Sequence, residues 1–67
     1  MEEIDVWKAA TILISAHGTS GATLIAIHRA KEFREKGDAA AVDVWKRVES
    51  AIVDLEKAGY EPNATWH

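Results

Sequence analysis

The chain has no cysteine and a single proline among its 67 residues. Without cysteine, neither disulfide bonds nor thiolate metal sites can hold so short a chain together. The only proline, Pro62, lies near the C-terminal end of the sequence, where it forbids continuation of a helix. Stability must therefore come from packing within the chain or from association with another chain.

Basic charge is also scarce, since eight Lys and Arg residues stand against eleven Asp and Glu residues, a formal net charge of −3. Binding to a phosphate backbone needs an excess of basic residues, so nucleic acid is an unlikely partner. The segment 1–5 is acidic where a secretory signal is basic, and no apolar run approaches the roughly 18 residues that cross a bilayer. We expect a cytoplasmic protein that contacts no membrane.

Glycine is infrequent but regularly placed, because Gly18, Gly37 and Gly59 each follow a run of helix-forming residues. Glycine tolerates the left-handed backbone conformation that ends many helices. These positions predict an all-α fold, a three-helix bundle that forms one domain over 1–59. The predicted helices cover 3–16, 20–36 and 39–58, and an irregular C-terminal tail covers 60–67.

Two of the predicted helices have a candidate N-terminal cap. Thr19 or Ser20 offers a hydroxyl at the start of the second helix, and Asp38 offers a carboxylate at the start of the third. Asp38 follows Gly37 directly, which leaves essentially no loop. The second and third helices are therefore expected to fold back on each other as a hairpin.

Apolar residues recur at helical spacing in each predicted helix. In the first helix the expected stripe is Trp7, Ala10 and Ile14, flanked by Val6 and Leu13. In the second helix, alanines at every fourth position form a strip that lets a neighbouring helix approach closely. The small residues of this strip are Ala22, Ala26 and Ala30. The third helix has the strongest apolar stripe of the chain, made of Ala41, Trp45, Val48, Ile52 and Leu55.

The second helix is apolar on nearly every side from Ala22 to Ile27, so we expect this half to be covered on more than one side. Three aliphatic residues, Ile12, Ile25 and Val53, fall on otherwise polar stripes. Isolated exposed aliphatic residues are common in soluble proteins, but three on so small a scaffold favour an interface.

Trp7 and Trp66 are the tryptophans that we expect to be exposed, and tryptophan is frequent among the residues that anchor interfaces. The sequence thus predicts a non-enzymatic helical interaction or regulatory module. We expect it to form a homodimer or to dock a protein partner.

The alternative is a nucleic-acid-associated regulator that uses a basic edge, made of His28, Arg29, Lys31, Arg34 and Lys36. No motif predicts a catalytic, cofactor or metal site, since no histidine stands at ligand spacing from another histidine or a suitable carboxylate. Gly18–Gly21 precedes a helix start, where free N–H groups can hold an anion, and this reading stays open.

Part of the chain resembles a known family. The residues that carry the resemblance lie between positions 7 and 55 and are Trp7, Ala10, Leu13, Ile14, His17 and Gly18, then Arg29, Ala30, Gly37 and Asp38, and finally Val44, Trp45, Lys46, Arg47, Ala51, Ile52 and Leu55. This pattern resembles a family of short proteobacterial helical proteins of unknown function. The resemblance implies bacterial cytosolic origin and the same helix boundaries, and it transfers no activity. The family often has a glycine where this chain has Ala39, Ala40 and Ala41.

Overall fold

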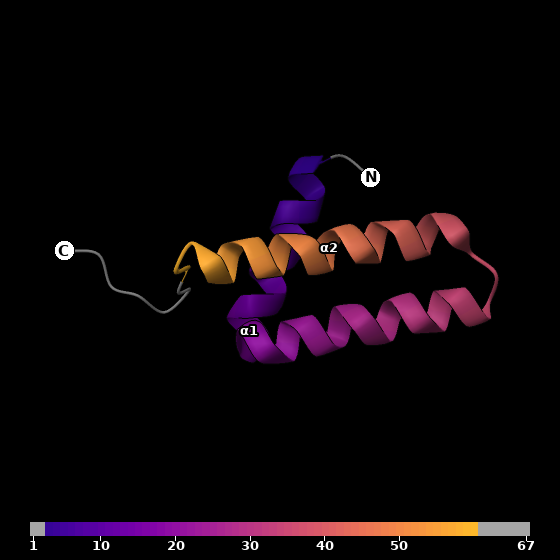
Figure 1. Ribbon diagram of the computed structural model, residues 1–67, viewed down its shortest axis with the longest axis horizontal. Coiled ribbons are helices and arrows are strands. Elements are labelled where there is room, and N and C mark those ends of the chain that lie inside the picture. Colours follow the sequence, from indigo (N-terminus) through magenta and orange to yellow (C-terminus); the bar gives the residue numbers. More distant parts are fainter. Residues whose placement is uncertain (1–2, 61–67) are drawn as a thin grey trace.

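The structure is a computed structural model that describes residues 3–60, and within them it consists of helices and short turns, without a strand. It contains two helices, α1 (Glu3–Glu35) and α2 (Ala39–Lys57). The all-α prediction is confirmed, but the prediction of three separate helices is wrong. The first two predicted helices form a single element, α1, which bends sharply at Gly18 (Figure 1).

Gly18 makes the bend with one residue, because its backbone lies at φ 77° and ψ 170°, far from helical values. Only glycine adopts this region readily. Helical turns continue directly on both sides, so no loop separates the two parts of α1. We call residues 3–17 arm 1 and residues 19–35 arm 2.

The predicted caps at the bend do not form. Thr19 and Ser20 lie inside α1, and the side-chain hydrogen bond nearby is donated by Thr23 Oγ1 to the carbonyl oxygen of Thr19, at 2.9 Å. A cap is needed where a helix begins after a loop and leaves free N–H groups. A one-residue bend provides no such loop.

The turn between α1 and α2 follows the prediction closely. The amides of Gly37 and Asp38 donate to the carbonyl oxygens of Arg34 and Phe33, which is the paired hydrogen bonding that ends a helix at a glycine. Gly37 has φ 76°, and the side chain of Asp38 caps α2 by accepting a hydrogen bond from the Ala41 amide at 3.0 Å. Arm 2 and α2 therefore run antiparallel as a hairpin (Figure 1).

The C-terminal end of α2 repeats this arrangement. Gly59 has φ 78°, and the amides of Gly59 and Tyr60 donate to the carbonyl oxygens of Glu56 and Leu55. The half-buried Tyr60 packs against the core. The rest of the predicted tail lies outside the described residues.

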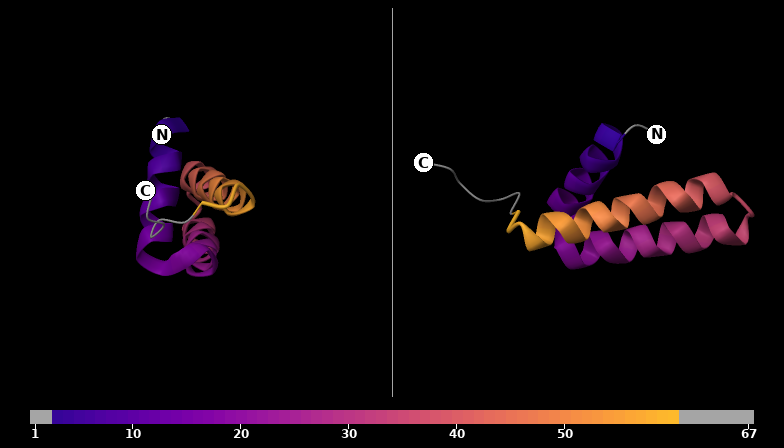
Figure 2. Two further views of the ribbon diagram at one scale, coloured as in Figure 1. Left: turned by 90° about the vertical axis from the view of Figure 1, so that its left-hand side faces the viewer. Right: turned by 45° about the horizontal axis from the view of Figure 1, so that its top comes forward.

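Arm 1 crosses the hairpin at a steep angle, so that residues of both arms and of α2 meet in one core (Figure 2). The core is small, because among residues 3–60 the large and fully buried side chains are Val6, Ile14, Val48 and Ile52. The other buried residues are alanines, including the predicted strip Ala22, Ala26 and Ala30. The strip thus lies at the closest contact of arm 2, as its lack of side-chain bulk predicted.

The buried stripe of arm 1 agrees with the prediction at Ala10 and Ile14 and differs at its first position, where Val6 replaces Trp7. Val6, Ala10 and Ile14 are buried, whereas Trp7 and Leu13 pack at the margin of the core. A residue and its fourth and eighth neighbours share one helix face, so the choice between Val6 and Trp7 depends on the direction in which arm 1 crosses the hairpin. In α2, Val48, Ala51 and Ile52 are buried and Trp45 and Leu55 pack beside them.

Candidate protein-docking surface

The side of arm 2 that faces away from α2 carries large uncovered aliphatic residues. Leu24 is 67% exposed and Ile27 is 46% exposed. Leu24 lies across the helix from the buried alanine strip and Ile27 lies to one side of it, about 100° around the helix axis from Ala26. Lys31 continues their line one turn later. We call Leu24, Ile27 and Lys31 the outer stripe of arm 2.

Arm 1 has a comparable outer face. Ile4 is 63% exposed and Ile12 is 66% exposed, and the exposed Lys8 lies between them on the same side of the helix. Asp5 borders this line and is exposed as well. We call Ile4, Asp5, Lys8 and Ile12 the outer stripe of arm 1.

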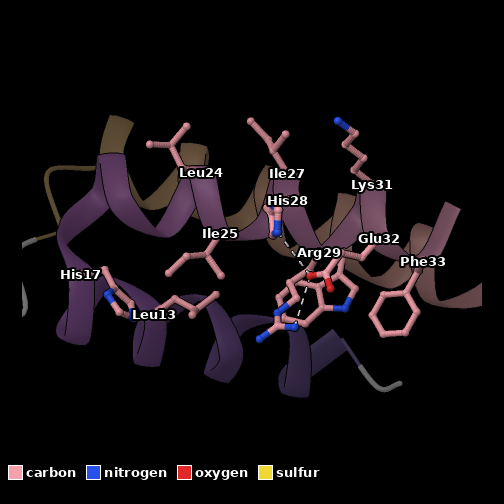
Figure 3. A pocket seen from close by; sticks show the side chains of 11 residues that line it. Leu13, His17, Leu24, Ile25, Ile27, His28, Arg29, Lys31, Glu32 and Phe33 are labelled. Carbon is pink, nitrogen blue, oxygen red and sulfur yellow. Dashed lines mark hydrogen bonds and ion pairs between the residues drawn. The ribbon is translucent and has the colours of Figure 1, made fainter. Parts of the chain in front are cut away.

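An open groove runs along the inside of the bend, between the two arms, and Figure 3 shows its side chains. Leu13 and His17 line it from arm 1, and Trp45 of α2 contributes to the lining. Ile25 and His28 line it from arm 2, together with the outer stripe of that arm. Its volume is about 1140 Å³. This is larger than most small-molecule sites, which are concave and enclose most of their ligand. A wide apolar groove of this kind suits a protein surface better than a metabolite.

The residues predicted to form an interface differ in how far their side chains are exposed. Ile12 is strongly exposed, Val53 is 37% exposed, and Ile25 is half-buried in the groove. Trp7 is half-buried, as is Trp45, so the expected greater exposure of Trp7 is not seen. Trp66 lies outside the described residues.

The expectation that the apolar half of arm 2 is covered on several sides is wrong. Leu24 and Ile27 belong to this half, and within the described part of the chain their side chains remain largely exposed. The alanine strip in the sequence indicates which side of arm 2 contacts a neighbour, but it does not say whether the side that carries Leu24 and Ile27 is covered as well. Arm 1 crosses elsewhere and leaves this face open.

The predicted basic edge is partly offset by Glu32. Its Oε1 atom lies 3.3 Å from Arg29 Nη1 and 3.7 Å from His28 Nε2, and dashed lines mark both contacts in Figure 3. Lys36 lies over the ring of Phe33, with 5.4 Å between Nζ and the ring centroid. These pairs are exposed and each is worth little in stability. They nevertheless reduce the positive field that this edge presents.

The described residues contain no group of three or more His, Asp or Glu side chains that could hold a metal ion. Their three ion pairs are local contacts within a helix, and the one in α2 joins Arg47 Nε to Asp43 Oδ2 at 3.1 Å. No buried side-chain nitrogen or oxygen lacks a hydrogen-bond partner in the part of the chain that is described. The candidate docking surface therefore offers apolar side chains for contact, with charged side chains at its edges.

By length and composition, α1 is also apolar enough to cross a membrane. Residues 9–27 contain no Asp, Glu, Lys or Arg, and only 22% of the apolar window is buried. Serines, threonines and glycines interrupt this segment, so it contains no long continuous apolar run. The core helix of a soluble protein or a signal sequence has the same composition, so this feature alone identifies no membrane span.

No protein-family model, no curated protein and no solved structure matches the chain. The resemblance to short proteobacterial proteins therefore remains a prediction. The function has to be argued from the surface itself.

Proposed function

We propose that this protein is a small, non-enzymatic interaction module that docks a protein, either a second copy of itself or another chain, through the outer stripes of α1. The observation that carries the proposal is the exposure of Leu24 and Ile27 on a bundle whose described residues include four large, fully buried side chains. Large apolar patches on small soluble proteins commonly mark interaction sites. Covering these residues would also add the apolar burial that so small a core lacks.

The proposal is tested with Leu24→Asp and Ile27→Asp, and Ser50→Asp on the exposed side of α2 is the matched control. Sedimentation of the purified protein over a concentration series measures self-association, and binding of a purified candidate partner is measured with the same variants. We expect the two α1 variants to weaken association at least about tenfold, because each places a charge in an apolar contact. The control should change it little.

The contrary outcome is equally clear. A wild-type protein that stays monomeric at high micromolar concentration, and whose partner binds the Leu24→Asp variant as tightly as the wild type, would exclude this surface as the docking site. Far-UV circular dichroism of each variant separates loss of binding from loss of fold.

A second candidate function is association with a lipid bilayer, and the low burial of the uncharged segment in α1 favours it. In the bent form neither arm spans a bilayer, because arms of 15 and 17 residues reach only about 22 and 26 Å against a core of about 30 Å. Association would then occur at the bilayer surface. Flotation with vesicles of neutral and anionic lipid tests it, and absence of bound protein in both rejects it.

The nucleic-acid alternative is retained as the third candidate because Lys31 and Arg34 are exposed on arm 2. Gel-shift binding that falls steeply with salt would support it, since displacement of counterions makes such binding salt-dependent. Indifference to duplex at low salt would dismiss it.

A further inference from the structure

The two outer stripes of α1 each carry an exposed aliphatic residue toward the bend, Ile12 in arm 1 and Leu24 in arm 2, with charged residues farther from it. Arm 1 also carries the exposed Ile4 at its far end. In arm 1 the charge beyond Ile12 includes Asp5, and in arm 2 the charge beyond Leu24 and Ile27 begins with Lys31. One stripe thus ends near an acidic group and the other ends in a basic group.

The match appears only when the two stripes are paired in opposite directions. Two adjacent helices have the same rise per residue, so opposing Ile12 to Leu24 in an antiparallel pair also opposes Ala9 to Ile27 and Asp5 to Lys31. This register forms two apolar pairs and one pair of opposite charge, while Lys8 faces His28 and Ile4 faces Glu32. A parallel pair with Ile12 against Leu24 opposes Asp5 to His17 and leaves Lys31 far from any acidic group of arm 1.

Within the described residues, neither Asp5 nor Lys31 takes part in an ion pair of its own chain. Both side chains are exposed. They are therefore available to a partner of opposite charge, and the same chain supplies one.

Resting on the docking function proposed above, we propose that the occupant of these stripes is a second copy of the chain. Arm 1 of each copy lies antiparallel on arm 2 of the other, with Ile12 on Leu24 of the partner subunit and Asp5 beside Lys31 of the partner subunit. The contact occurs twice and is reciprocal, so it closes as a symmetric dimer and leaves no stripe free for further chains.

A charge-exchange experiment tests the pairing. Asp5→Lys gives a homodimer in which lysines oppose each other at both contacts, and Lys31→Asp gives one in which aspartates oppose each other. A mixture of the two variants forms a heterodimer in which both contacts pair opposite charges. Asp54→Lys and Lys46→Asp are matched controls, because they make the same changes of charge at exposed positions of α2.

Sedimentation equilibrium of fluorescently labelled protein gives the dissociation constants. We expect each single variant to raise the dimer Kd about tenfold, and the equimolar mixture to return it to within about threefold of the wild type. The controls should stay close to the wild type. The difference between variants and mixture should shrink at high salt, which screens exposed charges.

Two results would overturn this inference. A wild-type dimer whose Kd is not restored in the mixture forms through another contact, and the docking function then stands without this pairing. A wild-type chain that is monomeric at high micromolar concentration does not take a second copy at all. In that case the Leu24→Asp comparison with a different purified partner decides the docking function separately.

Discussion

Gly21 lies so close to His17 that a Cβ atom placed on it would be 3.0 Å from the Cβ of His17. In a straight helix, Cβ atoms four residues apart are separated by about 5 to 6 Å. The short distance follows from the bend at Gly18, which lies between the two residues and folds one turn of α1 toward the next. Gly21 is not among the glycines with positive φ, so its backbone conformation does not call for glycine. The reason for glycine at this position is the short distance to His17.

Gly21→Ala should destabilise the protein, against the sign expected from helix propensity. Alanine favours a helix over glycine by about 1 kcal/mol, but the crowded contact should cost about 1 to 3 kcal/mol. The net loss lowers Tm by several degrees, since about 1 kcal/mol corresponds to about 4 to 8 °C in a domain of this size. Thermal unfolding followed by circular dichroism measures it, and a raised Tm would mean that the bend is looser than described.

Gly18→Ala should lower stability by about 1 to 3 kcal/mol, because φ 77° with ψ 170° is a region that L residues rarely adopt. The chain is short enough for chemical synthesis, which provides a matched control. D-alanine at position 18 adds the same methyl group but favours positive φ, so it should preserve stability. If both variants lose equal stability, the cause is the added volume and not the backbone. Small-angle scattering tests whether the L variant straightens α1.

Asp38→Ala should lower stability by about 0.5 to 2 kcal/mol, because it removes the carboxylate that accepts the Ala41 amide at the start of α2. Asp43→Ala is the matched control, since it removes an exposed carboxylate paired with Arg47 one turn away. That pair contributes only about 0.3 to 0.5 kcal/mol. Chemical denaturation gives both values, and a larger effect at Asp43 would contradict the capping assignment.

Opposite faces of arm 2 should respond oppositely to changes of side-chain size. Ala26 is fully buried and Leu24 is 67% exposed, only two residues away. Ala26→Leu should therefore cost about 1 to 3 kcal/mol of stability through overpacking. Leu24→Ala should change the unfolding free energy of the monomer by less than about 0.5 kcal/mol while weakening association. Urea unfolding at low protein concentration distinguishes the two, and a large loss from Leu24→Ala in the monomer would place it in the core.

Part of the docking surface was also readable from the sequence. Ile12 was predicted to interrupt a polar stripe, and it is among the most exposed large residues. Leu24 and Ile27 were not predicted, because a segment that is apolar all round gives no sign of which side a neighbour will cover. The alanine strip indicated the contact face, but only the position of arm 1 decides whether the other face is covered.

The sequence by itself determined the ends of the helices and the turn between α1 and α2. Glycines at 37 and 59 end each helix with paired backbone hydrogen bonds, and Asp38 begins the next, because these interactions involve only neighbouring residues. The tertiary structure decided that Gly18 is a bend within one helix, and that Val6 is buried where Trp7 was expected. It also decided that Leu24 and Ile27 remain uncovered. These features depend on the direction in which arm 1 crosses the hairpin, and that direction is set by packing between residues far apart in the chain.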